Sequence, residues 1–208
     1  MSHRNSFFDS FLSRNIVLVQ AVGVCPIILA GTTLQNGTAL AACTLAVLLP
    51  VSLIMSLIGE RLAAWLRPPL YTLLASGLML AAAFVLDRYI SQNVYARLYI
   101  FLPLMAINTL FTYRAGGYSV QHSPGLALLD ALGSGLGFGL VICIVSALRE
   151  AAVFGTLWGV ALPFRHRVAA AALPFAGFLI LAFMAAGLQW FKAALSRAAD
   201  RGRRQPHA

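Results

Sequence analysis

Charged residues are scarce in this sequence: they make up 10% of its 208 residues, and only six of them are acidic. A soluble globular domain carries roughly 25% charged residues, so this composition excludes an ordinary soluble fold. Hydrophobic residues account for 60% of the chain, and its mean hydropathy is +0.83. The length suits about six helices of some 20 residues, joined by short connections. We therefore expect an all-α integral membrane protein.

Cysteine is also scarce, and Cys25, Cys43 and Cys143 include no CxxC pair. The sequence therefore supports neither a zinc site nor a redox dithiol. A free cysteine in an apolar helix is usually a small buried hydrophobic residue, and we interpret Cys43 and Cys143 in this way. Cys25 differs because it precedes Pro26 in a short apolar segment that also contains Gly23. A cysteine in such a segment can hold a metal, but one cysteine alone rarely suffices as a site.

Basic residues outnumber acidic ones, and the net charge is +9. They lie at the termini and between apolar runs, which is how a membrane protein fixes its orientation in the lipid bilayer. This placement argues against nucleic acid as the partner. A chain with six membrane spans has both termini on the same side of the membrane. Ten of the fifteen lysines and arginines then lie on that side. We therefore expect both termini in the cytoplasm.

Gaps between charged residues divide the chain into six apolar spans. Two spans fit between Arg14 and Glu60, separated by a turn expected at residues 31–37, which are rich in turn formers. The other expected spans are residues 69–86, 98–113, 131–148 and a segment within 168–191. The first and fourth spans are the shortest, near the lower limit of about 17 residues for crossing a bilayer.

The sequence thus predicts three parts. They are a cytoplasmic amphipathic lead-in at residues 1–14, a six-span membrane domain at 15–191 and a basic cytoplasmic tail at 192–208. The membrane domain divides into three-span halves at about 15–90 and 91–191, and because three is odd, the second half enters from the opposite side. Short spans interrupted by glycine and proline at corresponding places are typical of such inverted repeats and mark a central site. We expect two short or broken helices to meet near the midplane.

Charged and small residues mark the fifth span. Asp130, Arg149 and Glu150 bracket it, and we interpret them as interfacial anchors. Helix-end pairing, subunit contacts or an ion path are the alternatives for these three residues. The glycines of the span indicate close helix packing. They are Gly133, Gly135, Gly137 and Gly139.

Several motifs together resemble one family from about Asn15 to Leu188. They are residues 18–26 (LVQAVGVCP), residues 100–103 (IFLP), Asn108, Arg114 with Ala115, Asp130 with the glycine-rich span, residues 148–150 (LRE) and residues 155–157 (GTL). In these motifs the chain resembles the E subunit of the Rnf electron-transport complex and the D subunit of the sodium-translocating NADH:quinone reductase (Nqr).

This resemblance implies a multi-pass subunit of an ion-translocating complex in the bacterial inner membrane. It also implies a homologous six-span partner, alongside other subunits of the complex. Each of the two homologous subunits would contribute two cysteines to one [2Fe–2S] cluster, which thiolates ligate in sets of four. Electrons would cross the bilayer through the cluster, coupled to sodium or proton movement. Cys25 matches the first ligand position, whereas Thr109 stands where the second cysteine is expected.

Because Thr109 stands where the resemblance implies a second cysteine, two functions remain as alternatives. The chain is either an E-like subunit that passes electrons through a shared cluster, or a relative without a cluster that acts as a structural subunit or small transporter. Any enzyme activity belongs to a complex, because we identify no flavin-attachment or nucleotide motif in the sequence.

Overall fold

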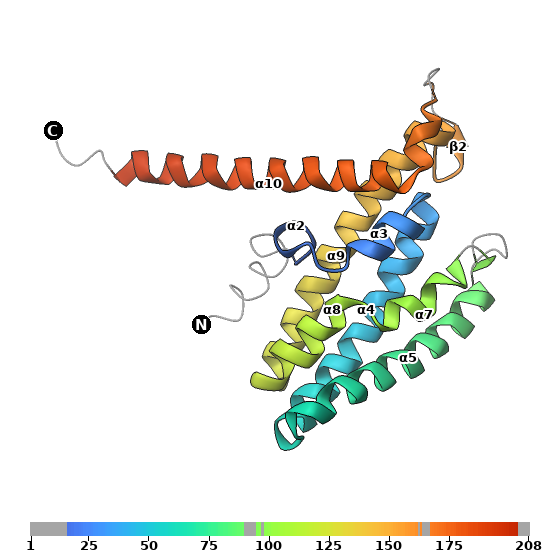
Figure 1. Ribbon diagram of the computed structural model, residues 1–208. Helices are drawn as coiled ribbons and strands as arrows, with labels where there is room; N and C mark the ends of the chain where they lie inside the picture. The colour runs from blue at the N-terminus through green and yellow to red at the C-terminus, as the bar shows by residue number, and fades with distance from the viewer. Residues whose placement is uncertain (1–15, 90–94, 97, 162, 164–166, 204–208) are drawn as a thin grey trace.

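The computed structural model describes residues 16–89, 95–96, 98–161, 163 and 167–203, and these residues are largely helical (Figure 1). Four helices are long enough and apolar enough to cross a membrane. They are α4 (Leu34–Ile58), α5 (Arg67–Tyr89), α9 (Pro124–Phe154) and α10 (Pro174–Arg203). The prediction of an all-α integral membrane protein is confirmed.

The expected first and fourth spans are both broken. The first consists of α2 (Ile16–Gln20) and α3 (Val24–Ala30), and the fourth of α7 (Phe101–Ala106) and α8 (Thr109–Phe111). The first break lies where Ala21 (φ 53°) and Gly23 (φ 77°) take left-handed backbone conformations. The second break contains Asn108, whose backbone is extended (ψ 135°). The prediction of short or broken helices at these two places is confirmed.

The two halves of the chain have the same order of elements: a broken helix followed by two long helices. The middle helices α4 and α9 run antiparallel and pack against each other at the centre (Figure 1). Helix α5 of the first half packs on α7 of the second, and α10 packs on α2 and α3 of the first. This exchange of partners is the arrangement expected of two inverted repeats.

Small residues bring α4 and α9 together. A Cβ atom on Gly135 would lie 2.5 Å from Leu45 Cδ1, and one on Gly37 would lie 2.5 Å from Ser146 Oγ. Both distances are shorter than real Cβ contacts, so a side chain at either position would displace its neighbour, and glycine lets the two helices pack closely. The interpretation of the glycines as packing residues is confirmed for Gly135.

Three boundaries differ from the sequence prediction. The turn expected at residues 31–37 is shorter, because the Thr33 side chain accepts a hydrogen bond from the Asn36 N–H and caps α4, which begins at Leu34. Helix α9 extends beyond the expected 131–148 at both ends, since the charged residues there are buried within the fold. Helix α10 continues through the expected tail as far as Arg203, and the lead-in at 1–14 lies outside the described residues.

The connections fall into two groups, one at each end of the α4–α9 pair. At one end lie η2 (Gly59–Arg61), η3 (Ala64–Leu66), the π-helix η4 (Thr112–Tyr118) and η5 (Ser119–Gln121). Gly59 packs closely against Val120, and this contact joins the connection between the second and third spans to the connection between the fourth and fifth. At the other end lie an antiparallel hairpin of β1 (Thr156–Leu157) and β2 (Val160–Ala161), and η6 (Ala169–Ala172).

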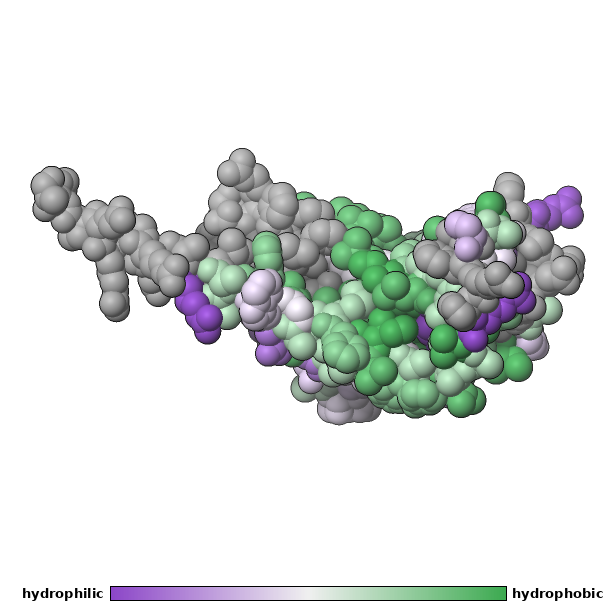
Figure 2. Space-filling model, turned by 90° about the horizontal axis from the view of Figure 1, so that it is seen from above, coloured by the Kyte–Doolittle hydropathy of each residue, from purple (hydrophilic) through white to green (hydrophobic). Residues whose placement is uncertain are grey.

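Hydrophobic residues cover much of the described surface, and hydrophilic ones stand in separate groups toward the two sides of the view from above (Figure 2). Large apolar side chains remain exposed on α5 and α10, among them Leu73 at 72% and Phe183 at 70%. Such a surface suits lipid or a membrane partner.

Candidate functional site

The two broken helices meet at their breaks, and we call this meeting point the junction: Gly23 and Cys25 from the first break with Asn108 and Thr109 from the second. The Gly23 N–H donates a hydrogen bond to Thr109 Oγ1 at 3.1 Å. This bond joins the two halves of the chain, and α3 and α7 pack on each other beside it. The structure thus brings together the two segments that the sequence analysis paired.

Asn108 organises the second break. Its side-chain oxygen accepts the Leu110 N–H at 3.2 Å and so caps α8, and the Thr109 hydroxyl lies 3.4 Å from the same oxygen. A Cβ atom on Gly23 would lie 3.3 Å from that oxygen, and the φ of Gly23 is also left-handed, so both geometry and space favour glycine there. The buried Asn108 Nδ2 has no hydrogen-bond acceptor among the described residues.

A cavity of about 400 Å³ opens beside the junction. Cys25, Asn108 and Thr109 line it together with apolar side chains that include Leu29, Leu104 and Ile107. Cys25 itself is exposed, as are Leu29, Leu104 and Ile107 at 49%, 57% and 71%. The junction therefore presents one thiol on an open, mostly apolar face.

Cys25 has no second thiol near it among the described residues. Cys43 is buried in α4, and Cys143 lines a separate cavity between α4 and α9. The part of the chain that the structure describes contains no group of three or more His, Cys, Asp or Glu side chains that could hold a metal ion. The junction thus offers a single thiolate ligand, with the Thr109 hydroxyl at the other break.

Arg149 anchors the end of the half-helix that carries Cys25. Its guanidinium donates to the carbonyl oxygens of Ile28 at 2.6 Å and Gly31 at 3.2 Å, where α3 ends. The same group donates to the carbonyls of Ala171 at 3.1 Å and Ala172 at 2.8 Å, in η6. A helix end leaves such carbonyls without intrahelical partners, and a cation satisfies them. Arg149 therefore joins α9, α3 and η6.

Glu150 accepts hydrogen bonds from the start of α4 and from the hairpin. Its carboxylate accepts the Leu34 N–H at 2.7 Å, at the start of α4. It also accepts the Thr156 hydroxyl and the Gly159 N–H, each at 3.1 Å, from the hairpin. An anion at a helix N-terminus complements the helix dipole. Arg149 and Glu150 thus fix both sides of the turn between α3 and α4.

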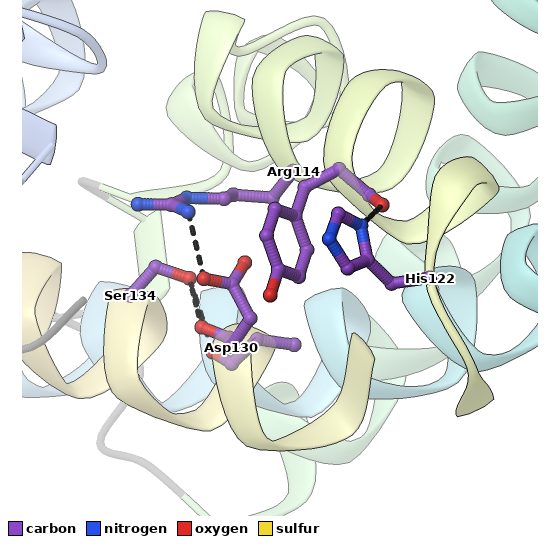
Figure 3. Close-up of polar contacts among 6 residues, drawn as sticks. Arg114, His122, Asp130 and Ser134 are labelled. Carbon is purple, nitrogen blue, oxygen red and sulfur yellow. Dashed lines mark hydrogen bonds and ion pairs between the residues drawn. The ribbon is translucent and has the colours of Figure 1, made fainter. Parts of the chain in front are cut away.

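A buried ion pair lies near the N-terminal end of α9, opposite the end that carries Arg149 and Glu150 (Figure 3). Arg114 from η4 donates to Asp130 Oδ1 at 2.7 Å, and the two side chains are 12% and 2% exposed. His122 stacks on Tyr118 nearby, with ring centroids 3.9 Å apart. Burial raises the pKa of the Tyr118 phenol, the charge of Asp130 acts in the same direction, and Arg114 opposes both.

The interpretation of Asp130, Arg149 and Glu150 as interfacial anchors is wrong. The three residues are only 1%, 1% and 3% exposed, and each is bound to groups of another element. Helix-end pairing, which the sequence analysis kept as an alternative, is the correct interpretation. Position in the sequence did not distinguish interfacial anchors from helix-end pairing, because both roles place charged residues at the ends of an apolar run.

Comparisons with known proteins agree with this fold. A family model described as "Rnf-Nqr subunit, membrane protein" matches residues 3–188. Three similar curated proteins are each named as the E subunit of an ion-translocating oxidoreductase complex. The protein of Edwardsiella ictaluri is 30% identical to this chain, and the match covers 74% of this chain and 65% of the relative. The protein of Shewanella amazonensis is 31% identical, with 76% of this chain and 67% of the relative covered. The protein of Aliivibrio fischeri is 29% identical, with 76% of this chain and 69% of the relative covered.

This chain spans about two thirds of the length of these relatives. The matched region includes both breaks and the charged ends of α9, which are the features that build the junction. With the family match covering most of the sequence, the chain belongs to the Rnf-Nqr family of membrane subunits.

Proposed function

We propose that this chain is the E-like membrane subunit of an Rnf-type ion-translocating oxidoreductase complex. The observation that carries the proposal is the junction of two broken helices, held by the Gly23–Thr109 hydrogen bond within a chain of this family. Broken helices near the midplane form central sites in membrane proteins with inverted repeats. The relatives' names supply the class of complex.

The partner we propose is a homologous six-span subunit that packs against the junction face. This face is defined by exposed Cys25, Leu29, Leu104 and Ile107. Backbone at such a break lacks regular helical hydrogen bonds, so lipid is a poor neighbour for it and a protein surface a good one.

The shared [2Fe–2S] cluster needs four thiolates, two from each subunit in the arrangement that the resemblance implies. The junction places one cysteine, Cys25, and one threonine, Thr109, at the corresponding positions. Because an alcohol is not a standard ligand of such clusters, this donor set does not fit half of a four-thiolate site. We therefore derive no electron-transfer step through this chain, and the proposal is an E-like subunit that has a structural role in the complex and holds no cluster.

Co-purification tests the proposal. An affinity-tagged full-length chain, extracted from its native membrane in mild detergent, should bring down a homologous membrane subunit identifiable by mass spectrometry. Ile107→Trp should abolish this capture because a large ring on the junction face blocks close packing. Leu73→Trp is the matched control: Leu73 is equally exposed on α5, and its variant should capture the partner normally.

Recovery of the tagged chain without any homologous subunit would refute the pairing. Equal capture by the Ile107 variant and the wild type would place the partner on another face. Both outcomes are read from the same mass spectra, with the amount of tagged chain as the reference.

We also propose that the chain lies in the bacterial inner membrane with both termini in the cytoplasm, on the strength of the distribution of lysine and arginine. Alkaline phosphatase, which folds only outside the cytoplasm, should be inactive when fused after residue 208 and active when fused after residue 161, in the β-hairpin connection. Green fluorescent protein fused at the same two places should give the opposite pattern. Phosphatase activity after residue 208 would reverse the orientation.

A further inference from the structure

A continuous set of hydrogen bonds spans the junction. The Gly23 N–H donates to Thr109 Oγ1, and the Thr109 hydroxyl in turn donates to Asn108 Oδ1, which also accepts the Leu110 N–H. Each of these groups comes from a break in a helix, where backbone groups lack regular partners. The hydroxyl of Thr109 is therefore engaged both as acceptor and as donor, and it links the first half of the chain to the second.

The donor chemistry of the junction does not allow the same atom to ligate iron. The Thr109 oxygen already accepts a backbone N–H at 3.1 Å, and a neutral alcohol lacks the negative charge and softness of a thiolate. Of the other cysteines, Cys43 is 3% exposed within α4, and Cys143 lines a cavity between α4 and α9. Cys25 is thus the one thiol that the junction offers among the described residues.

We infer that the junction of this chain is joined by hydrogen bonds through Thr109 in place of an iron–sulfur cluster, and that Cys25 remains a free thiol in the assembled complex. The statement about the complex rests on the proposed pairing, whereas the statement about Thr109 concerns this chain alone. The consequence is specific: Thr109 acts as a positioning residue that holds the two breaks together.

The first experiment compares Thr109→Val with Thr109→Ser in the detergent-solubilised full chain, using tryptophan fluorescence to follow thermal unfolding. Valine matches the shape of threonine but removes the hydroxyl, whereas serine keeps it. We expect the valine variant to unfold about 6 °C lower than wild type and the serine variant to stay close to wild type, as the loss of the two hydrogen bonds of this hydroxyl predicts. Equal midpoints for the two variants would overturn the role of Thr109.

The second experiment measures iron in the purified complex for the wild type and for Cys25→Ala. Comparing the two removes the contribution of iron held by other subunits. We expect equal iron content and superimposable electron paramagnetic resonance spectra after reduction by dithionite. Loss of two iron atoms per complex in the Cys25 variant, together with loss of one signal, would overturn the inference. A chain that captures no partner would refute the pairing instead, and the Thr109 comparison would still test the junction.

Discussion

Replacement of Arg149 with methionine is expected to lower the thermal unfolding midpoint of the full-length chain by about 10 °C or to prevent its folding. The guanidinium binds four backbone carbonyls, from α3 and η6, and is 1% exposed. Methionine keeps the apolar stem of the side chain but leaves the buried Ile28 and Gly31 carbonyls without this donor, which costs about 1–3 kcal/mol for each group left unsatisfied. A loss of several kcal/mol corresponds to a shift of this size in a chain of this length.

Two variants make the measurement specific. Arg149→Lys keeps the charge and up to three donors but loses the planar fork, so its midpoint should fall between those of methionine and wild type. Arg167→Met removes an exposed arginine, and its midpoint should stay at the wild-type value. The anchoring role of Arg149 would be disproved if Arg149→Met and Arg167→Met unfolded at the same temperature. Tryptophan fluorescence and size-exclusion chromatography in detergent report folding independently of activity.

The expected loss also bears on the junction. Helix α3 carries Cys25 near its start, and Arg149 holds the carbonyls of Ile28 and Gly31 at its end. A helix of seven residues has little stability of its own, so its position depends on contacts at both ends. Arg149 therefore positions one side of the junction from the far end of the half-helix, as Thr109 does from the break itself.

The fold could be predicted in outline from the sequence because charge and turn-forming residues mark the span limits directly. The long apolar runs of α5 and α9 lie between charged residues, and the glycine and proline near Cys25 indicate a break. Local signals misplaced the start of α4, where Asn36 and Gly37 suggested a turn. In the folded chain Gly37 packs against Ser146 on α9, and the Thr33 cap starts the helix before it.

The roles of the buried charges could not be predicted, because their partners are mostly backbone groups that the fold assembles from distant segments. Arg149 binds carbonyls of Ile28 and Gly31, more than 100 residues away, and no sequence pattern marks a carbonyl that needs a donor. The hydrogen bond between Gly23 and Thr109 also joins distant segments. The sequence did predict that the two short segments pair. It also shows that Thr109 stands in the second segment where the resemblance implies a cysteine.

Loss of Arg114 should be the other strongly destabilising change, because it removes the cation that lies 2.7 Å from the buried Asp130 carboxylate. We expect Arg114→Met to cost about 3–5 kcal/mol, the usual range for removing one partner of a buried ion pair. Asp130→Asn should cost less, since the amide oxygen can still accept from Arg114 and the Arg114 side chain is 12% exposed. Thermal unfolding of the full-length chain measures both effects.

The decisive variant is the double replacement, Arg114→Met with Asp130→Asn. If the cost of Arg114→Met comes from an uncompensated charge, removing that charge should restore part of the lost stability, so the double variant should unfold at a higher temperature than Arg114→Met alone. Additive effects of the two changes would show that the residues act independently in spite of their 2.7 Å contact. A positive coupling would identify the pair as the bond that holds η4, and with it the end of the second broken span, against α9.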